Sequence, residues 1–244
     1  MRPGVPDVHI TDRHDTELAA YRALPGQAVL GLILGLLAPL AIVDPLLWTI
    51  PALGAVLSWW ALRRIRNNAP AMAGRGMAWA GLTLSLLLLA AAPTDWLAYR
   101  QLLRHEAQQF SALWFRYLLH DAPQKAHQLT TLPQFRESLD AHLWAVYRNS
   151  PELRRDLEHY VEQPLVRTLL ALGPRAQVRF YDTVDQMHDA GREFIDQAYA
   201  VTYEEDGQRK SFFVAVRMAR MKFVSGGAGW RILQTEAGVR PEGW

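Results

Sequence analysis

The chain has 244 residues, with 26 lysines and arginines against 24 acidic residues and a formal net charge of +2 at pH 7. So small an excess of positive charge gives no reason to expect a nucleic acid partner. Cysteine is absent, which excludes disulfides, thiolate metal sites and cysteine nucleophiles. Half of the residues are hydrophobic although the mean hydropathy is only −0.07, so the apolar residues must be concentrated in part of the chain.

Residues 1–23 are predicted to form a polar N-terminal tail. They mix acidic and basic side chains, and the apolar stretch that follows is far longer than the short core of a secretory signal peptide. We therefore expect that this segment is not a cleavable secretory signal peptide.

Residues 24–93 are predicted to be a transmembrane anchor whose partner is the lipid bilayer. Three apolar runs, at about residues 24–43, 46–62 and 76–92, have the composition of membrane helices, and residues 28–62 contain a single charge, Asp44. A helix needs about 20 residues to cross the hydrocarbon layer, so these runs are short and should borrow flanking aromatic residues. Such residues occur near the run ends: Trp48, Trp59, Trp60, Trp79, Trp96 and Tyr99.

Arginines predict the orientation of this anchor. The loop at residues 63–75 carries Arg63, Arg64, Arg66 and Arg75 and no acidic residue. Short loops rich in lysine and arginine remain in the cytoplasm. A third helix that starts inside then delivers residues 95–240 to the opposite side, which predicts a multi-pass protein of the cell (inner) membrane with an extracytoplasmic domain.

Glycines indicate how the anchor packs. Gly31 and Gly35 lie one helical turn apart, a spacing that permits close helix contact. Packing within the hairpin is the simpler interpretation, and pairing with a protein partner or in a homo-oligomer is the alternative. Asp44, followed by Pro45, is interpreted as a turn residue between the first two runs.

The order of these segments resembles a small bacterial membrane family, domain of unknown function 4190, over about residues 20–92. The matching positions are Ala61, Leu62, Ile65, Gly74, Arg75, Gly76, Ala78, Ala80 and Gly81. The chain departs from the family pattern at Ala55, where the family has histidine, and at Ser85, where it commonly has glycine. The resemblance implies a membrane domain and brings no activity with it.

Residues 95–172 are predicted to be helical. Leu103, Ala107, Phe110, Trp114 and Tyr117 form one apolar stripe on a helix at 95–122. A second helix is expected at about residues 131–148, with Pro133 in its first turn. Ser150 should cap a third helix that Pro164 interrupts, and the last helical piece should end at Gly173.

Four strands are predicted to follow, at residues 178–185, 193–204, 210–224 and 229–235. Asp206 and Gly207 have the composition of a hairpin turn. Helices followed by an antiparallel four-stranded meander predict an α+β domain. This order resembles the cone-like nuclear transport factor 2-like or cystatin-like architecture, which hosts enzymes, binding modules and inert scaffolds alike.

A cone of this kind encloses a pocket in some proteins, and polar or aromatic residues on its inward faces would line it. The candidates are Trp114, Tyr117, Trp144, Tyr147, Arg179, Tyr181, Gln197, Tyr199, Arg217 and Trp230. Arg217 interrupts an apolar strand, so it should pair with Asp182, Glu193 or Asp196.

No catalytic motif selects a reaction. The spacing patterns of zinc hydrolases, serine hydrolases and phosphate-binding loops are absent. His120 and His127 lack a clear third ligand, and Asp182, Asp185 and Asp196 are equally eligible as a general base. We therefore predict no metal, no cofactor and a non-enzymatic binding or assembly module. The alternatives are a cone-fold enzyme for a small apolar molecule and a subunit of a membrane complex.

Overall fold

A computed structural model describes residues 24–67, 73–223 and 226–238 of the chain. The polar tail predicted at residues 1–23 and part of the arginine loop lie outside these residues. The chain divides into two compact units, residues 1–100 and 101–244. Helix α4 (Arg75–Leu119) contributes to both.

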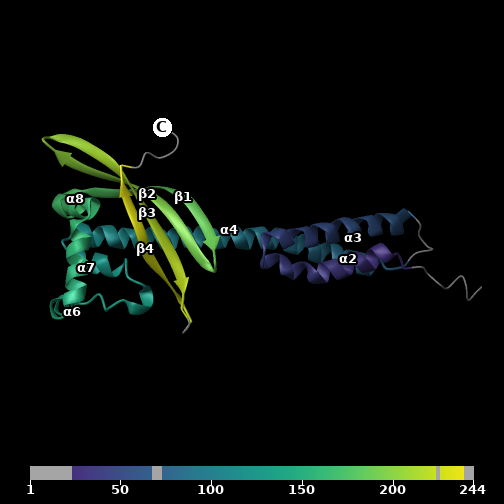
Figure 1. Cartoon of the computed structure of the whole chain (residues 1–244). Helices are drawn as coiled ribbons and strands as arrows, with labels where there is room; N and C mark the ends of the chain where they lie inside the picture. Colours follow the sequence, from purple (N-terminus) through teal and green to yellow (C-terminus); the bar gives the residue numbers. More distant parts are fainter. Residues whose placement is uncertain (1–23, 68–72, 224–225, 239–244) are drawn as a thin grey trace, which may run out of the picture. The chain divides into compact units, whose positions relative to one another are not determined.

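The first unit is a helical hairpin packed against the N-terminal half of α4 (Figure 1). Helix α2 (Gly26–Leu37) continues into the 3₁₀ helix η1 (Ala38–Ile42). After a turn, η2 (Pro45–Trp48) leads into α3 (Thr49–Asn67). The turn depends on Asp44, which has extended backbone angles and accepts a hydrogen bond from the Leu46 backbone N–H at 2.8 Å. The interpretation of Asp44 as a turn residue is confirmed.

Small residues fill the contacts among these three helices. A Cβ atom added to Gly31 would lie 2.3 Å from the Ser58 Oγ, and one added to Gly54 would lie 2.5 Å from the Ser85 Oγ. Gly81 approaches the Gly31 backbone so closely that an added Cβ would lie 2.9 Å from its carbonyl carbon and oxygen. The glycines therefore contact other helices of the same chain. This agrees with the simpler interpretation of their spacing, which was packing within the hairpin.

Helix α4 runs without a break from Arg75 to Leu119, through Pro93. The sequence predicted two helices, ending at about residue 92 and restarting at 95. An internal proline removes one backbone donor from a helix, and its ring crowds the carbonyl group four residues earlier. The helix continues through Pro93 despite this cost, with Ala92 and Leu103 buried on its two sides.

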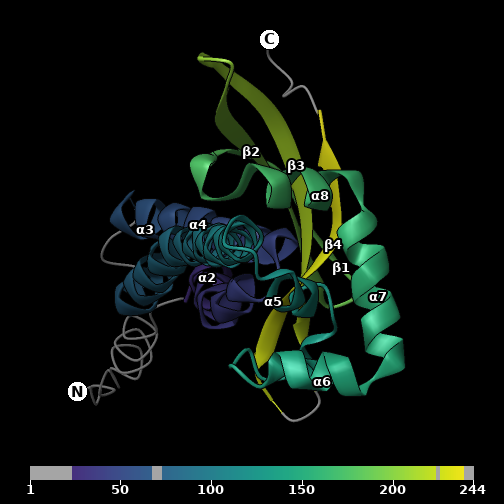
Figure 2. The ribbon, with the colours of Figure 1, turned by 90° about the vertical axis from the view of Figure 1, so that its left-hand side faces the viewer.

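The second unit continues with short helices gathered near the end of α4. These are α5 (Pro123–Gln128), η3 (Pro133–Phe135), α6 (Leu143–Asn149), α7 (Pro151–Glu162), α8 (Pro164–Leu172) and η4 (Gly173–Arg175). Figure 2 shows α7 lengthwise, with α6 at one of its ends and α8 at the other. The Ser150 cap is confirmed, because its Oγ accepts a hydrogen bond from the Leu153 N–H at 3.4 Å.

The helix predicted at residues 131–148 is wrong over most of its length. Only η3 and α6 are helical there. Arg136 instead donates to the carbonyl oxygens of Gln128 and Trp230, both at 2.9 Å, and the Glu137 N–H donates to the Gln128 Oε1 at 2.9 Å. These hydrogen bonds to residues outside the segment hold it in an extended conformation, and they outweigh its local helix propensity.

The sheet is an antiparallel meander in the order β1-β2-β3-β4, as predicted. Its strands are β1 (Gln177–Asp189), β2 (Arg192–Glu205), β3 (Gln208–Lys222) and β4 (Ala228–Ala237). The Asp206-Gly207 turn is confirmed, with φ of 52° and 71°. The sequence analysis missed a second two-residue turn at Ala190-Gly191, which has φ of 47° and 74°.

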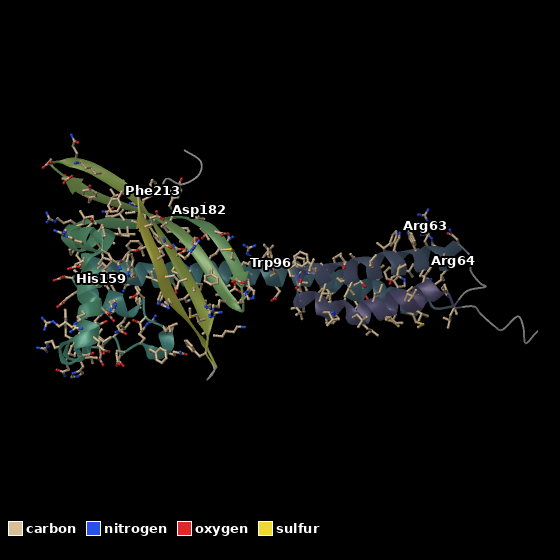
Figure 3. The ribbon with its side chains drawn as sticks, viewed as in Figure 1. Arg63, Arg64, Trp96, His159, Asp182 and Phe213 are labelled. Atoms are coloured by element: carbon tan, nitrogen blue, oxygen red, sulfur yellow. The ribbon has the colours of Figure 1, made fainter. Side chains whose placement is uncertain are left out.

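One face of the sheet, here called the inner face, packs against α4 and the short helices. Figure 1 shows the strands lying across the C-terminal half of α4. Tyr199, Val214 and Met218 from the sheet join Leu103 and Trp114 from α4 in one core, all at most 2% exposed. The opposite face, here called the outer face, carries Phe213 and Asp182 (Figure 3).

The glycine contacts make a direct prediction. Gly81→Ala places a methyl group against the Gly31 backbone and should cost about 1–3 kcal/mol of unfolding free energy through overpacking. The matched control is Gly76→Ala in the first turn of the same helix, where an added Cβ meets nothing within 4 Å. Denaturant titration of the purified protein in detergent should rank the two variants in this order, and equal stability would contradict the packing.

Candidate functional site

A chain of buried polar side chains lies beneath the sheet, within its apolar core. The Tyr199 hydroxyl donates to the Gln197 Oε1 at 2.7 Å and also bonds the Ser111 hydroxyl of α4. The Gln197 Nε2 donates to the Arg104 carbonyl oxygen at 3.0 Å. Burial raises the pKa of Tyr199 to about 12. The hydroxyl therefore stays protonated, and its bonds join the sheet to the helix.

A second buried network lies among α4, α5, α6 and α7. The Tyr147 hydroxyl bonds the His127 Nδ1 at 2.7 Å and accepts from the Gln128 Nε2 at 2.9 Å. The Trp114 Nε1 donates to the Tyr160 hydroxyl at 2.7 Å. Burial raises the pKa of Tyr147 to about 12 and also raises that of Tyr160. These side chains form hydrogen bonds with one another, so their role is structural.

The ten residues proposed to line a pocket do not converge on one. The buried members are Trp114, Tyr147, Gln197, Tyr199 and Trp230, with Tyr117 partly buried. The exposed members are Trp144, Arg179, Tyr181 and Arg217. Trp230 is further tied to α4, since its Nε1 donates to the Glu106 Oε2 at 3.1 Å.

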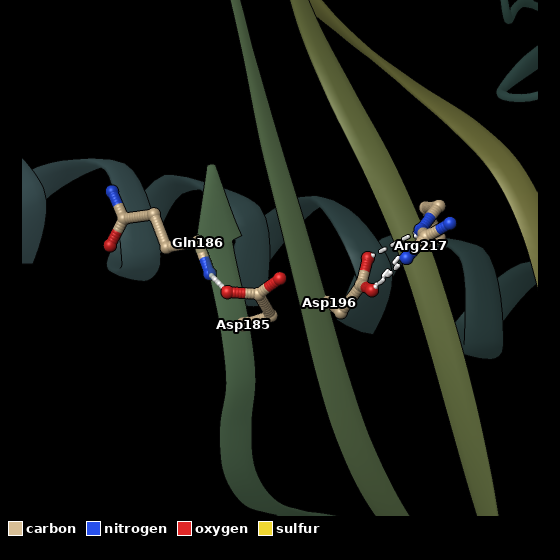
Figure 4. A network of polar contacts seen from close by, with 4 residues as sticks. All are labelled: Asp185, Gln186, Asp196 and Arg217. Carbon is tan, nitrogen blue, oxygen red and sulfur yellow. Dashed lines mark hydrogen bonds and ion pairs between the residues drawn. The ribbon is translucent and has the colours of Figure 1, made fainter. Parts of the chain in front are cut away.

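Arg217 lies on the outer face and pairs with Asp196, one of the three partners expected for it (Figure 4). Its Nη2 lies 2.6 Å from the Asp196 Oδ2, and its Nε bonds the same carboxylate at 2.9 Å. This carboxylate raises the pKa of Arg217. The pair is solvent-exposed on one side, so its net stabilisation is at most about 1 kcal/mol. Because the Asp196 carboxylate is bound to Arg217, it is not available as a general base.

An apolar groove opens between α6 and α7, with a volume of about 390 Å³. Trp144, Tyr147, Leu157 and Val161 supply its apolar surface. Its lining also includes Pro123 and the charged residues Arg148, Arg154, Glu158 and Glu162. Arg154 and Glu158 pair with each other at 3.0 Å. The volume falls in the range of small-molecule sites.

The sequence analysis identified only Trp144 and Tyr147 of this groove. The available signal for the α7 wall was the spacing of Leu157 and Val161, part of an apolar stripe on that helix. Trp144 and Tyr147 supply the wall from α6.

A polar hollow of about 500 Å³ lies at one end of the sheet. Its lining includes the arginines Arg175, Arg179 and Arg209 and the carboxylate Glu204. Arg179 is the only member that the sequence had marked.

The two histidines considered as metal ligands, His120 and His127, bond other groups. His120 bonds the Arg116 carbonyl oxygen of its own helix at 2.9 Å, while His127 bonds Tyr147. Within the described ranges, no three histidine, aspartate or glutamate side chains gather as metal ligands.

Comparison with known proteins gives no match, whether with family models, with curated proteins or with solved structures. The resemblance to domain of unknown function 4190 therefore stays a prediction.

Removing the Tyr199 hydroxyl tests the buried hydrogen bonds beneath the sheet. Tyr199→Phe leaves the Gln197 Oε1 without its buried donor and should cost about 1–3 kcal/mol of unfolding free energy. Tyr203→Phe is the control, because in the described part of the chain the Tyr203 hydroxyl has no hydrogen-bond partner and lies on the same strand. Urea titration should separate the two variants; a Tyr199→Phe protein as stable as the control would contradict the role of the chain.

The second network predicts a dependence of stability on pH. Burial lowers the pKa of His127, which the charge of Asp156 only partly offsets. As the pH falls, His127 is protonated more readily in the unfolded chain than in the folded protein. The free energy of unfolding should therefore fall as the pH drops below about 6.5. His127→Gln should flatten this fall between about pH 7.5 and pH 5. Replacing the exposed His142 by glutamine should leave it unchanged; equal slopes for all three proteins would refute the assignment.

Proposed function

We propose that residues 24–93 anchor the protein in a membrane. The observation that carries this proposal is an inverted distribution of side chains in the first unit. The residues buried between its helices are mostly small, namely Ala28, Gly31, Gly35, Gly54, Ser58, Ala61, Ala78, Gly81 and Ser85, with Ile65, Leu82 and Leu88 the larger ones. Large apolar side chains point outward instead.

The exposed fractions of the leucine side chains show this inverted distribution. Leu36 on α2, Leu53 on α3 and Leu87 on α4 are 63%, 57% and 62% exposed. Helices packed through small residues, with leucines facing outward, are typical of membrane proteins because lipid solvates leucine as well as a protein core does. Two helices, Pro45–Asn67 and Arg75–Leu119, are long and apolar enough to cross a membrane, while Gly26–Ile42 is a shorter apolar helix.

Aromatic residues support a spanning arrangement of α4. Trp79 and Trp96 lie about 25 Å apart along a helix that rises about 1.5 Å per residue, close to the thickness of the hydrocarbon layer. Trp96 packs edge-on against Trp48, with ring centroids 6.1 Å apart, and the Arg100 guanidinium lies 4.6 Å from the Trp96 centroid. Such residues favour the headgroup region.

Arginines support the orientation. Arg63 and Arg64 lie together at the end of α3, opposite to Trp96 in the first unit (Figure 3). With Arg66 and Arg75 they form the positive end of the anchor, which favours the cytoplasm. We propose an inner-membrane protein of a bacterial cell, related to domain of unknown function 4190, that holds residues 101–244 outside the cytoplasm.

We propose that the second unit binds a ligand or partner without catalysing a reaction. The buried hydrogen bonds support this, because Gln197 and Tyr199 bond each other and α4. The Tyr147 hydroxyl bonds His127 and Gln128 of α5. The apolar groove between α6 and α7 keeps the alternative of an enzyme for a small apolar molecule open to experiment. Assembly through the glycines is disfavoured, since they already contact neighbouring helices.

Reporter fusions test the topology. An alkaline phosphatase fused after residue 244 should be active, and a green fluorescent protein fused there should be dark, because only the former folds outside the cytoplasm of a bacterium. Replacing Arg63, Arg64, Arg66 and Arg75 by glutamine should reduce the phosphatase activity severalfold, since the orienting charge is lost. A matched control replaces Arg154, Arg155, Arg167 and Arg192 of the second unit by glutamine. A bright fluorescent fusion with an inactive phosphatase would overturn the orientation.

A further inference from the structure

The hollow at the end of the sheet is lined by residues of η4, β1, β2 and β3. Strand pairing places Ala200 opposite Arg179 and Thr202 opposite Gln177, and it places Glu204 opposite Arg209. Because side chains alternate between the two faces of a strand, these residues share the outer face. Arginines from β1 and β3 thus flank β2, which presents Ala200, Thr202 and Glu204 on this face.

The third arginine of the hollow is held by a different element. Arg175 ends η4, two residues after Gly173, whose φ of 58° turns the chain from α8 toward β1. The three guanidinium groups therefore come from a 3₁₀ helix and two non-neighbouring strands, and the fold brings them to one hollow of about 500 Å³.

The arginines of this hollow differ from many others in the second unit in lacking partners. Arg154, Arg217 and Arg220 each form an ion pair. Within the described residues, the side chains of Arg175, Arg179 and Arg209 form neither an ion pair nor a hydrogen bond. Three cations that line one hollow repel one another, and this repulsion is relieved when an anion binds.

Nearby carboxylates do not supply that anion. Glu205 is bound to Lys210 at 2.6 Å. Glu204 lines the hollow and lies opposite Arg209, but it forms no ion pair with it in the described structure. One carboxylate against three guanidinium groups leaves the hollow positive.

We propose that this hollow binds a small ligand that carries at least two oxyanion groups, either phosphates or carboxylates. Guanidinium groups bind both through paired N–H donors. Two groups are required because Arg179 and Arg209 lie on opposite sides of β2 and are offset along it, so one compact anion does not bridge them. The hydroxyls of Thr202 and Ser211, 2.9 Å apart, add neutral donors on the same face.

The test is calorimetric titration of the full chain in nanodiscs of phosphatidylcholine, whose headgroups carry no net charge. Sodium tripolyphosphate and sodium citrate are the two probes. The Arg179→Gln/Arg209→Gln double variant should bind the preferred probe at least about tenfold more weakly, since each charge-assisted contact is worth about that factor. Arg217→Gln is the matched control on the same face, outside the hollow and already paired with Asp196.

Binding of either probe that is lost in the double variant and kept within about twofold in Arg217→Gln supports the site, and the preferred probe distinguishes phosphate from carboxylate. Absence of binding by both probes would overturn the proposal, as would equal losses in the double variant and the control. Arg175→Gln supplies an independent variant, expected to weaken binding several-fold, and thermal unfolding checks that all variants fold. The reporter fusions test the anchor separately, so either proposal can fail alone.

Discussion

The second unit depends on one interaction, the packing of the inner face of the sheet against the C-terminal half of α4. Trp114 and Phe115 from the helix meet Tyr199 from β2, with centroids of Phe115 and Tyr199 5.0 Å apart. Each such buried aromatic contributes about 1.5–3 kcal/mol. The hydrogen bonds of Ser111 and Gln197 then fix which residues of helix and sheet face each other, because a shifted sheet would leave buried polar groups unpaired.

The same helix follows an opposite rule in its first half. There the small residues Gly81 and Ser85 are buried while Leu86 and Leu87 are exposed. A water-soluble helix would reverse this arrangement, since each exposed leucine forgoes about 1.5–3 kcal/mol of burial. The first half of the helix therefore has the side-chain distribution expected of the proposed membrane anchor, and this distribution changes near Pro93 and Trp96.

Local signals account for what could be predicted. Apolar runs, Asp44 with Pro45, Ser150 with Pro151, and Asp206 with Gly207 each determine structure within a few residues, so the hairpin, α7 and the β2–β3 turn were predictable. The segment at residues 136–142 was not, because its bonds reach to Trp230. For the same reason the hollow was missed. Arg209 lies 30 residues from Arg179 in sequence, and the register of the strands brings it near Arg179 and the neighbouring Arg175.

The polar side chains beneath the sheet are occupied by bonds within the protein. In an open cone, residues such as Gln197 and Tyr199 would be free to bind a ligand, but here they bind α4. The apolar groove beside Trp144 and the charged hollow around Arg179 are both open to solvent, and they differ in chemistry. A site made of exposed arginines forms its contacts without disturbing the core, so ligand binding and stability should vary independently when its residues are changed. This separation is what allows charge-removing variants of the hollow to report on binding alone.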